Sequence, residues 1–163
     1  MAVLTDFTSY DEIRAVLGVS EEELEDVTLA LPIYLQVLQF DLGDVHSDVE
    51  SLYETLNATP PPLTTAQQRF LNVAQVFSAY AVSRNLLTSI ALFAPKRITD
   101  GRAETDRVTD PFEDLRNSVN IGYQNLRNRL VAALEGLGEN VNPAASRVYT
   151  STAGLATDPI LGT

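Results

Sequence analysis

The chain has 163 residues, the usual size of one domain, and its 45% hydrophobic and 20% charged residues are typical of an ordinary soluble globular protein. With 11 basic against 22 acidic residues the net charge is −11, so the surface should repel polyanions, and a general nucleic-acid binder is excluded. Cysteine is absent and histidine occurs once, which excludes disulfide scaffolds, thiolate zinc sites, cysteine nucleophiles, His-clustered metal sites and Ser-His-Asp triads.

Charge is unevenly distributed along the sequence. Residues 1–62 hold 13 acids and one base, residues 63–138 hold seven acids and nine bases, and residues 139–163 hold two acids and one base. An acidic front half joined to an arginine-bearing back half has complementary faces, which suits head-to-side contact between copies of the chain. Acidic helices that simply face water explain the same pattern.

Five sites carry the capping-box pattern that marks helix starts. The pairs are Ser9 with Glu12, Ser20 with Glu23, Ser47 with Glu50, Thr65 with Gln68, and Asp110 with Glu113. No basic segment precedes an apolar core at the N-terminus, and no apolar run approaches the roughly 20 residues of a membrane span. We therefore expect a helical protein that is made and kept in the cytosol unless a larger assembly carries it out.

The front half predicts three helical segments. A short helix over 10–17 ends at Gly18. From Leu24 an acidic second helix continues as one apolar stripe (Val27, Leu31, Leu35, Leu38, Leu42, Val45), and Pro32 predicts a kink or split near residues 28–32. A helix over 48–57 precedes a stiff linker at Pro60–Pro62.

Two long helices follow. The segment 66–93 is apolar almost all round, which predicts the buried central helix, and Arg84 within it needs a carboxylate or carbonyl partner. The segment 111–137 has one apolar face. Its opposite face carries arginine and amide side chains: Arg116, Asn117, Asn120, Gln124, Asn125, Arg127, Asn128 and Arg129. We expect this face to contact a neighbouring subunit, chiefly through Arg116, Asn120 and Arg127; a face that only meets solvent is the alternative.

The segment between the long helices predicts a projecting hairpin at Asp100-Gly101. Four bases, Lys96, Arg97, Arg102 and Arg107, cluster around this turn, so we expect it to touch a neighbouring subunit or the tail of a larger assembly; a mobile solvated hairpin is the alternative.

Beyond Gly138 the helical periodicity stops, which divides the chain into a helical domain over 1–138 and an extended C-terminal arm over 139–163. We expect the arm to bind a partner, with residues 147–152 pairing as a strand. The residues expected to make this contact are Arg147, Val148, Tyr149, Leu155, Ile160 and Leu161.

Catalytic patterns are weak. Glu21, Glu22 and Glu25, with Glu50 and Glu54 opposite, resemble the Mg²⁺-binding acids of all-helical nucleotide pyrophosphohydrolases. The helix dipole and the Ser20 cap already explain the first three, and no available base in this half could bind a triphosphate. His46 precedes a cap and is interpreted as a turn residue. We expect no catalytic residue, metal or cofactor.

Two segments resemble the head-to-tail adaptor, or head-completion connector, of tailed bacteriophages. Phe7 to Ser20 (FTSYDEIRAVLGVS) is similar to the start of that family, and Phe93 to Glu104 (FAPKRITDGRAE) is similar to its interhelical loop. The resemblance implies a structural virion protein that forms a ring, usually of twelve copies, between the portal and the tail or nozzle protein. It also implies a C-terminal arm on the portal, a channel through which DNA passes, and a location in the virion neck without a membrane.

The expected fold is all-α, a small helical bundle with two long antiparallel helices, a projecting interhelical loop and an extended arm. The alternatives are the Mg²⁺-dependent helical pyrophosphohydrolase and another phage assembly protein.

Overall fold

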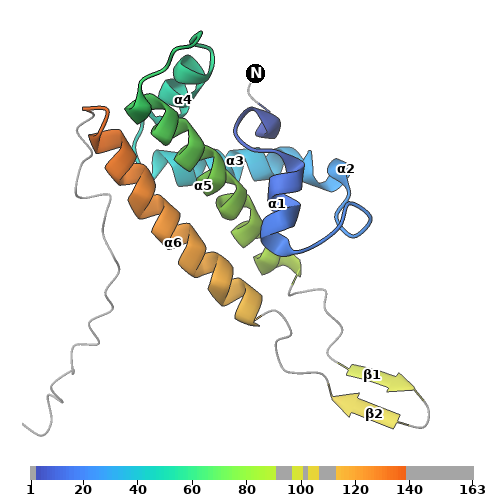
Figure 1. Cartoon of the computed structure of the whole chain (residues 1–163). Helices are drawn as coiled ribbons and strands as arrows, with labels where there is room; N and C mark the ends of the chain where they lie inside the picture. The colour runs from blue at the N-terminus through green and yellow to red at the C-terminus, as the bar shows by residue number, and fades with distance from the viewer. Residues whose placement is uncertain (1–2, 91–96, 101–102, 107–112, 139–163) are drawn as a thin grey trace, which may run out of the picture.

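The described part of the chain is helical except for one two-stranded hairpin, in agreement with the predicted all-α class. A computed structural model describes residues 3–90, 97–100, 103–106 and 113–138 (Figure 1). In these ranges the chain forms a 3₁₀ helix, η1, six α-helices and one two-stranded hairpin. The elements are η1 (Leu4–Asp6), α1 (Tyr10–Leu17), α2 (Asp26–Leu29), α3 (Pro32–Gly43), α4 (Val49–Asn57), α5 (Thr65–Ile90), β1 (Arg97–Asp100), β2 (Ala103–Asp106) and α6 (Glu113–Glu135).

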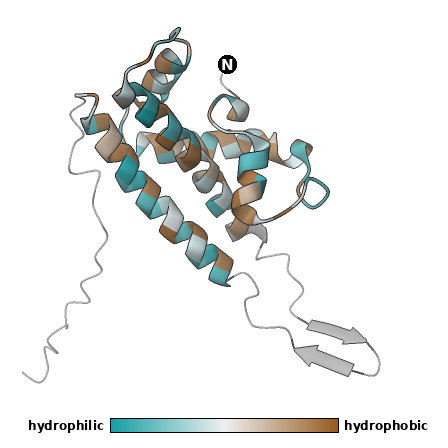
Figure 2. Ribbon diagram, viewed as in Figure 1, coloured by the Kyte–Doolittle hydropathy of each residue, from teal (hydrophilic) through white to brown (hydrophobic). Residues whose placement is uncertain are grey.

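Helix α5 is the centre of the fold. It contacts α1, α3, α4 and α6, and α6 lies along it in Figure 1. Phe70 and Phe77 of α5 are completely buried, and the Phe77 ring lies 5.2 Å from that of Tyr123 on α6, measured between ring centroids. Buried residues occur around much of α5, whereas α6 alternates between hydrophilic and hydrophobic residues along its length (Figure 2). The prediction that the first long helix is the buried one is therefore confirmed.

Helix α1 has the boundaries that its sequence predicts. The Ser9 hydroxyl accepts a hydrogen bond from the Glu12 amide, and the Glu12 carboxylate accepts one from the Ser9 amide. Gly18 ends the helix with a φ of 69°, the left-handed conformation that glycine adopts without a steric penalty.

The predicted helix start at Ser20 is wrong. Glu23 does accept hydrogen bonds from Ser20, but residues 21–24 form turns, and α2 begins only at Asp26. The reason is tertiary: the buried Arg14 guanidinium donates to the Leu24 carbonyl at 2.9 Å and pairs with Asp26. This contact holds the segment in a looped path that a local capping pattern does not encode.

The predicted split at Pro32 is confirmed. Helix α2 ends at Leu29, and α3 begins with Pro32 in its first turn, where the missing amide costs no hydrogen bond. Because of this break, the prediction of a single continuous apolar stripe is wrong. Leu38 and Leu42 are buried, but Val27 and Leu31 are exposed, since the chain changes direction between the two helices.

Two further capping predictions are wrong. The helix predicted at 48–57 is present, but Asp48 precedes it without a side-chain cap, and Ser47 instead donates to the Asp48 carboxylate. At α5 the reciprocal pair is Thr64 with Gln67, one residue earlier than predicted, because the sequence Thr-Thr-Ala-Gln-Gln satisfies the pattern in two registers.

The predicted hairpin is present in its strand pairing. β1 and β2 pair antiparallel with Asp100 opposite Ala103. Lys96, Gly101, Arg102, Arg107, the Asp110 cap and the arm over 139–163 lie outside the described residues.

Candidate functional site

The outer face of α6 contains the arginine and amide residues singled out in the sequence. Asn117, Asn120, Gln124, Asn125, Asn128 and Arg129 are exposed, and Arg116 and Arg127 are half-buried. Residues 115–134 contain three arginines and no acid. Ile121 lies in the middle of this stretch with 63% of its surface exposed. The opposite side of α6 is buried through Val119, Tyr123, Leu130 and Leu134, which confirms the predicted apolar face.

Arg127 is partly engaged within its own subunit. Its Nη2 donates to the Asp44 carbonyl at the end of α3, at 3.2 Å. The predicted contact face therefore divides between residues that tie α6 to its own fold and residues that face outward.

The partner that Arg84 requires is present and is a carboxylate. Its Nη2 lies 3.8 Å from Oδ1 of Asp41 on α3, and its guanidinium carbon lies 4.2 Å from the centre of the Tyr123 ring on α6. The Tyr123 hydroxyl donates to the same Asp41 oxygen at 3.1 Å. Three helices thus meet at one polar cluster, Asp41–Arg84–Tyr123. The sequence identified Arg84 but not its partners; an aspartate within the apolar run of α3 was the available signal.

The ionisation of this cluster follows from its burial. Burial raises the pKa of the Asp41 carboxyl, although Arg84, the hydrogen bond from Tyr123 and Asn85 all lower it. Burial, with the nearby Asp41 charge, raises the pKa of Tyr123 to about 12. The tyrosine therefore stays protonated at neutral pH and remains a hydrogen-bond donor. The geometry is that of an internal brace between helices, and it supplies the carboxylate partner that the sequence predicted for Arg84.

Arg14 is buried and internally paired. Besides the Leu24 carbonyl and Asp26, it contacts Asp11 at 3.0 Å. It is the one base among residues 1–62, so the outward surface of α1–α4 presents acids without an exposed base.

The first three acids of the hydrolase alternative, Glu21, Glu22 and Glu25, do not lie on a helix. Glu21 and Glu22 lie in the exposed turn before α2, and Glu25 precedes its first residue. Within the part of the chain that the structure describes, no group of three histidine or acidic residues could hold a metal ion. Glu50 accepts a hydrogen bond from Gln39 at 2.7 Å, and His46 accepts one from the Asp48 amide in the turn before α4, as a turn residue does.

Sequence reasoning missed an apolar surface on α3. Ile33 and Phe40 are 53% and 74% exposed, and Val37 between them is half-buried. Their spacing of four and three residues places them on one face, and Asp44 continues the same row. These side chains lie outside the stripe of α3 that packs inward. Their own spacing of four and three residues was the sequence signal for this second apolar surface.

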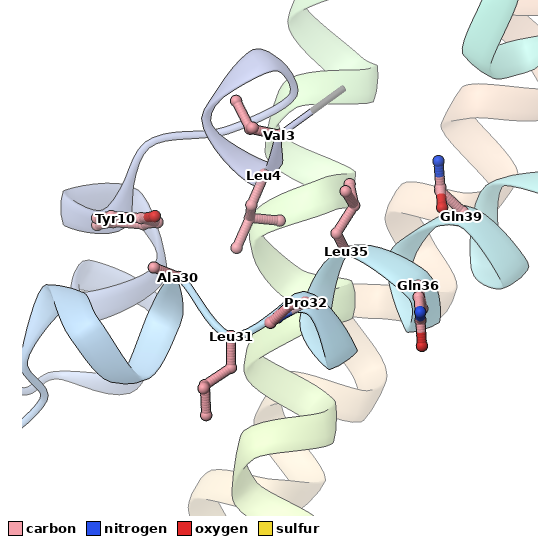
Figure 3. A pocket seen from close by; sticks show the side chains of 9 residues that line it. All are labelled: Val3, Leu4, Tyr10, Ala30, Leu31, Pro32, Leu35, Gln36 and Gln39. Atoms are coloured by element: carbon pink, nitrogen blue, oxygen red, sulfur yellow. The ribbon is translucent and has the colours of Figure 1, made fainter. Parts of the chain in front are cut away.

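An apolar pocket of about 430 Å³ lies beside this surface, between the N-terminal segment and the α2–α3 junction (Figure 3). The Leu4 side chain extends from η1 toward α3, the Leu35 side chain extends from α3 toward η1, and Gln36 and Gln39 of α3 also line the pocket. The full lining is Val3, Leu4, Tyr10, Ala30, Leu31, Pro32, Leu35, Gln36 and Gln39. With few polar groups and no charged lining residue, it offers contact area rather than catalytic groups.

Comparison with known protein families, curated proteins and solved structures finds no match to this chain. Among the helices in the described ranges, none is both long and apolar enough to cross a membrane. The predicted arm residues Arg147, Val148, Tyr149, Leu155, Ile160 and Leu161 lie outside the described ranges, and so do the side chains of Arg97 and Asp100.

Proposed function

We propose that the protein is a head-to-tail adaptor of a tailed bacteriophage, a structural virion protein whose copies form a ring between portal and tail. One observation carries the proposal: exposed acids occur along α1–α4, whereas the middle of α6, residues 115–134, has three arginines and no acid. The resemblance of residues 7–20 and 93–104 to the adaptor family supports the same function.

The charge separation is suited to ring assembly. The α1–α4 region exposes acids such as Glu22, Glu25 and Asp44, whereas the outer face of α6 between residues 115 and 134 has no acid. Two different complementary surfaces on one subunit generate head-to-tail contacts, which close into a ring when the rotation between copies allows it. A negative lumen would let DNA pass without sticking, because phosphates are repelled.

The remaining predicted sites acquire roles in this assembly. The two long helices run antiparallel, and the loop between them projects toward a neighbouring subunit or the tail through Lys96, Arg97, Asp100, Gly101, Arg102 and Arg107. The arm over 139–163 binds the portal. Its apolar side chains enter pockets on that partner, and its backbone at 147–152 pairs with an exposed strand edge.

The test is the mass of the purified protein, alone and mixed with the portal protein of its phage. We expect a stable complex that contains several copies of this chain for each portal ring. A protein that neither binds the portal nor enters virions would contradict the proposal. A second test is the variant with Arg97 and Arg102 changed to Glu, which should fold but assemble less well.

A further inference from the structure

Helix α3 has apolar side chains on all its sides, although only one side packs on the bundle. Leu38 and Leu42 are buried. On another side, Ile33 and Phe40 are 53% and 74% exposed, with Val37 half-buried between them. We call Ile33, Val37 and Phe40 the α3 strip. A helix that is apolar all round is normally covered on all its sides, so the strip is typical of a surface that a further segment covers.

The α3 strip is continuous with the apolar pocket between η1 and α3. Gln36 lies three residues after Ile33 and four before Phe40, and it also lines the pocket (Figure 3). Leu4 and Leu35 form part of the pocket wall, and its volume of about 430 Å³ is within the range of pockets that enclose a ligand. Strip and pocket therefore form one apolar surface with room for several side chains.

This surface carries no exposed charge of its own. Asp41 is the only charged residue between positions 32 and 43, and it is buried against Arg84 and Tyr123. No residue that lines the pocket is charged. A charged partner would lose hydration here without gaining an ion pair, so the surface fits an apolar segment with few charges.

The chain itself contains such a segment. Residues 153–163 (AGLATDPILGT) lie outside the described ranges and contain three large apolar residues, Leu155, Ile160 and Leu161. Asp158 is the one charged side chain among them. The segment thus matches the surface in having apolar side chains and almost no charge.

The chain is long enough for this contact within one subunit. Helix α6 passes the end of α3, where Arg127 donates to the Asp44 carbonyl, and α6 ends at Glu135, about 12 Å further along its axis at 1.5 Å per residue. Along α3, Ile33 is about 17 Å from Asp44 by the same measure. Residues 139–154 can span up to about 55 Å when extended, so the apolar residues that follow them can reach the strip and the pocket.

We propose that residues 153–163 dock on the α3 strip and the adjoining pocket of their own subunit, through Leu155, Ile160 and Leu161. The tether favours this contact over one between copies, because it supplies an effective concentration of about millimolar. The inference goes beyond the proposed function, because it concerns the free subunit; only competition with the portal rests on that function. The docked segment shields its apolar side chains until the portal takes them.

A single tryptophan tests the docking, because the natural chain contains none. In the full-length Leu161→Trp protein, tryptophan emission should lie at a shorter wavelength than that of a tryptophan in water. Adding Ile33→Ser and Phe40→Ser should move it toward the value in water. Ile121→Ser with Val76→Ser removes two exposed hydrophobic residues elsewhere, 63% and 42% exposed, and should leave the emission unchanged. Emission typical of water while the strip is intact would overturn the inference.

Paired cysteines locate the contact, because cysteine is also absent. At low micromolar concentration, the chain with Phe40→Cys and Ile160→Cys should close an internal disulfide at least about tenfold faster than the chain with Ile121→Cys and Ile160→Cys. Non-reducing electrophoresis measures both rates. Equal rates would overturn the inference. Disulfide-linked dimers in place of the closed monomer would also overturn it, and would show that a second copy covers the strip.

Portal binding separates this inference from the proposed function. Because the proposed portal contact uses the same side chains, Ile33→Ser with Phe40→Ser should strengthen portal binding by up to about tenfold, and unchanged or weaker binding would contradict the competition. If the emission and disulfide results hold but no portal binds, the adaptor function fails and the docking stands. If the portal binds without them, the docking fails and the adaptor function stands.

Discussion

The guanidinium carbon of Arg84 lies 4.2 Å from the centre of the Tyr123 ring, a cation–π contact that joins α5 to α6. Asp41 of α3 is near both residues, 3.8 Å from the arginine nitrogen and 3.1 Å from the tyrosine oxygen. A shift of any of the three helices along its axis would break one of these contacts. The cluster therefore fixes the relative position of α3, α5 and α6.

The first prediction concerns the pH dependence of this cluster. The pKa of Asp41 is raised above its usual 3.8, mainly by burial, so the folded protein holds this proton at a pH where the unfolded chain has lost it. The free energy of unfolding of the unchanged chain should therefore fall, relative to that of Asp41→Asn, as pH rises from the pKa of Asp41 in the unfolded chain to its pKa in the folded protein. Above the folded pKa, the difference in free energy of unfolding between the two proteins should no longer change with pH. Urea unfolding of both proteins from pH 3 to 7 measures this difference. If the unchanged chain gained stability relative to Asp41→Asn as pH rises, the prediction would be contradicted.

The hydroxyl of Tyr123 gives a second prediction. Tyr123→Phe keeps the ring under Arg84 but removes the hydrogen bond to Asp41, so the free energy of unfolding at pH 7 should fall by about 1 kcal/mol. Tyr10→Phe, at a partly buried tyrosine on α1, is the control and should change it less. An equal loss in both variants would show that the Asp41 contact has no special contribution.

The third prediction compares alanine substitutions at Gly122 and Gly43, which should change the stability of the fold in different directions. A Cβ at this position would lie inside contact distance of the Tyr80 ring on α5, whereas one at Gly43 would meet no atom within 4 Å. Gly122→Ala should destabilise the fold by about 1–3 kcal/mol despite the better helix propensity of alanine, and Gly43→Ala should be neutral or stabilising. Thermal unfolding checks both. Tyr80→Leu should relieve much of the Gly122→Ala cost, and strict additivity of the two changes would refute the steric explanation.

Arg14 should control the order of the segment before α2. Arg14→Met removes the donor to the Leu24 carbonyl and the pairs with Asp11 and Asp26, so amide hydrogen exchange should accelerate over residues 19–26. Arg69→Met, at an exposed arginine on α5, should leave that exchange unchanged. Unaltered protection in the Arg14 variant would mean that the local turns hold the segment by themselves.

Removal of residues 141–163 should separate folding from portal binding. The described helical core lies before residue 139, so the truncated chain should keep its far-UV circular dichroism spectrum and its unfolding midpoint within a few degrees. It should lose portal binding, because the arm carries the apolar side chains proposed to enter the portal. Full affinity in the shortened chain would refute the role of the arm.

The sequence determined the features that depend on near neighbours. The cap at Ser9, the stop at Gly18, the split at Pro32 and the strand pairing around residue 101 each arise from residues a few positions apart, whose spacing is visible in the chain. The same local reasoning proved wrong at Ser20, Ser47 and Thr65, where a distant contact or a competing neighbour changed the outcome.

Only the tertiary structure decided which residues meet and which stay outside. It joined Arg84 to Asp41 and Tyr123, which stand 43 and 39 positions away on other helices, and it left Ile33 and Phe40 in solvent although they are as apolar as the buried Leu38. Hydrophobicity favours burial equally for all such residues, but α3 can turn only one side toward α5. The direction in which the chain leaves Pro32 and the packing of α5 select that side, and no spacing within α3 contains this information.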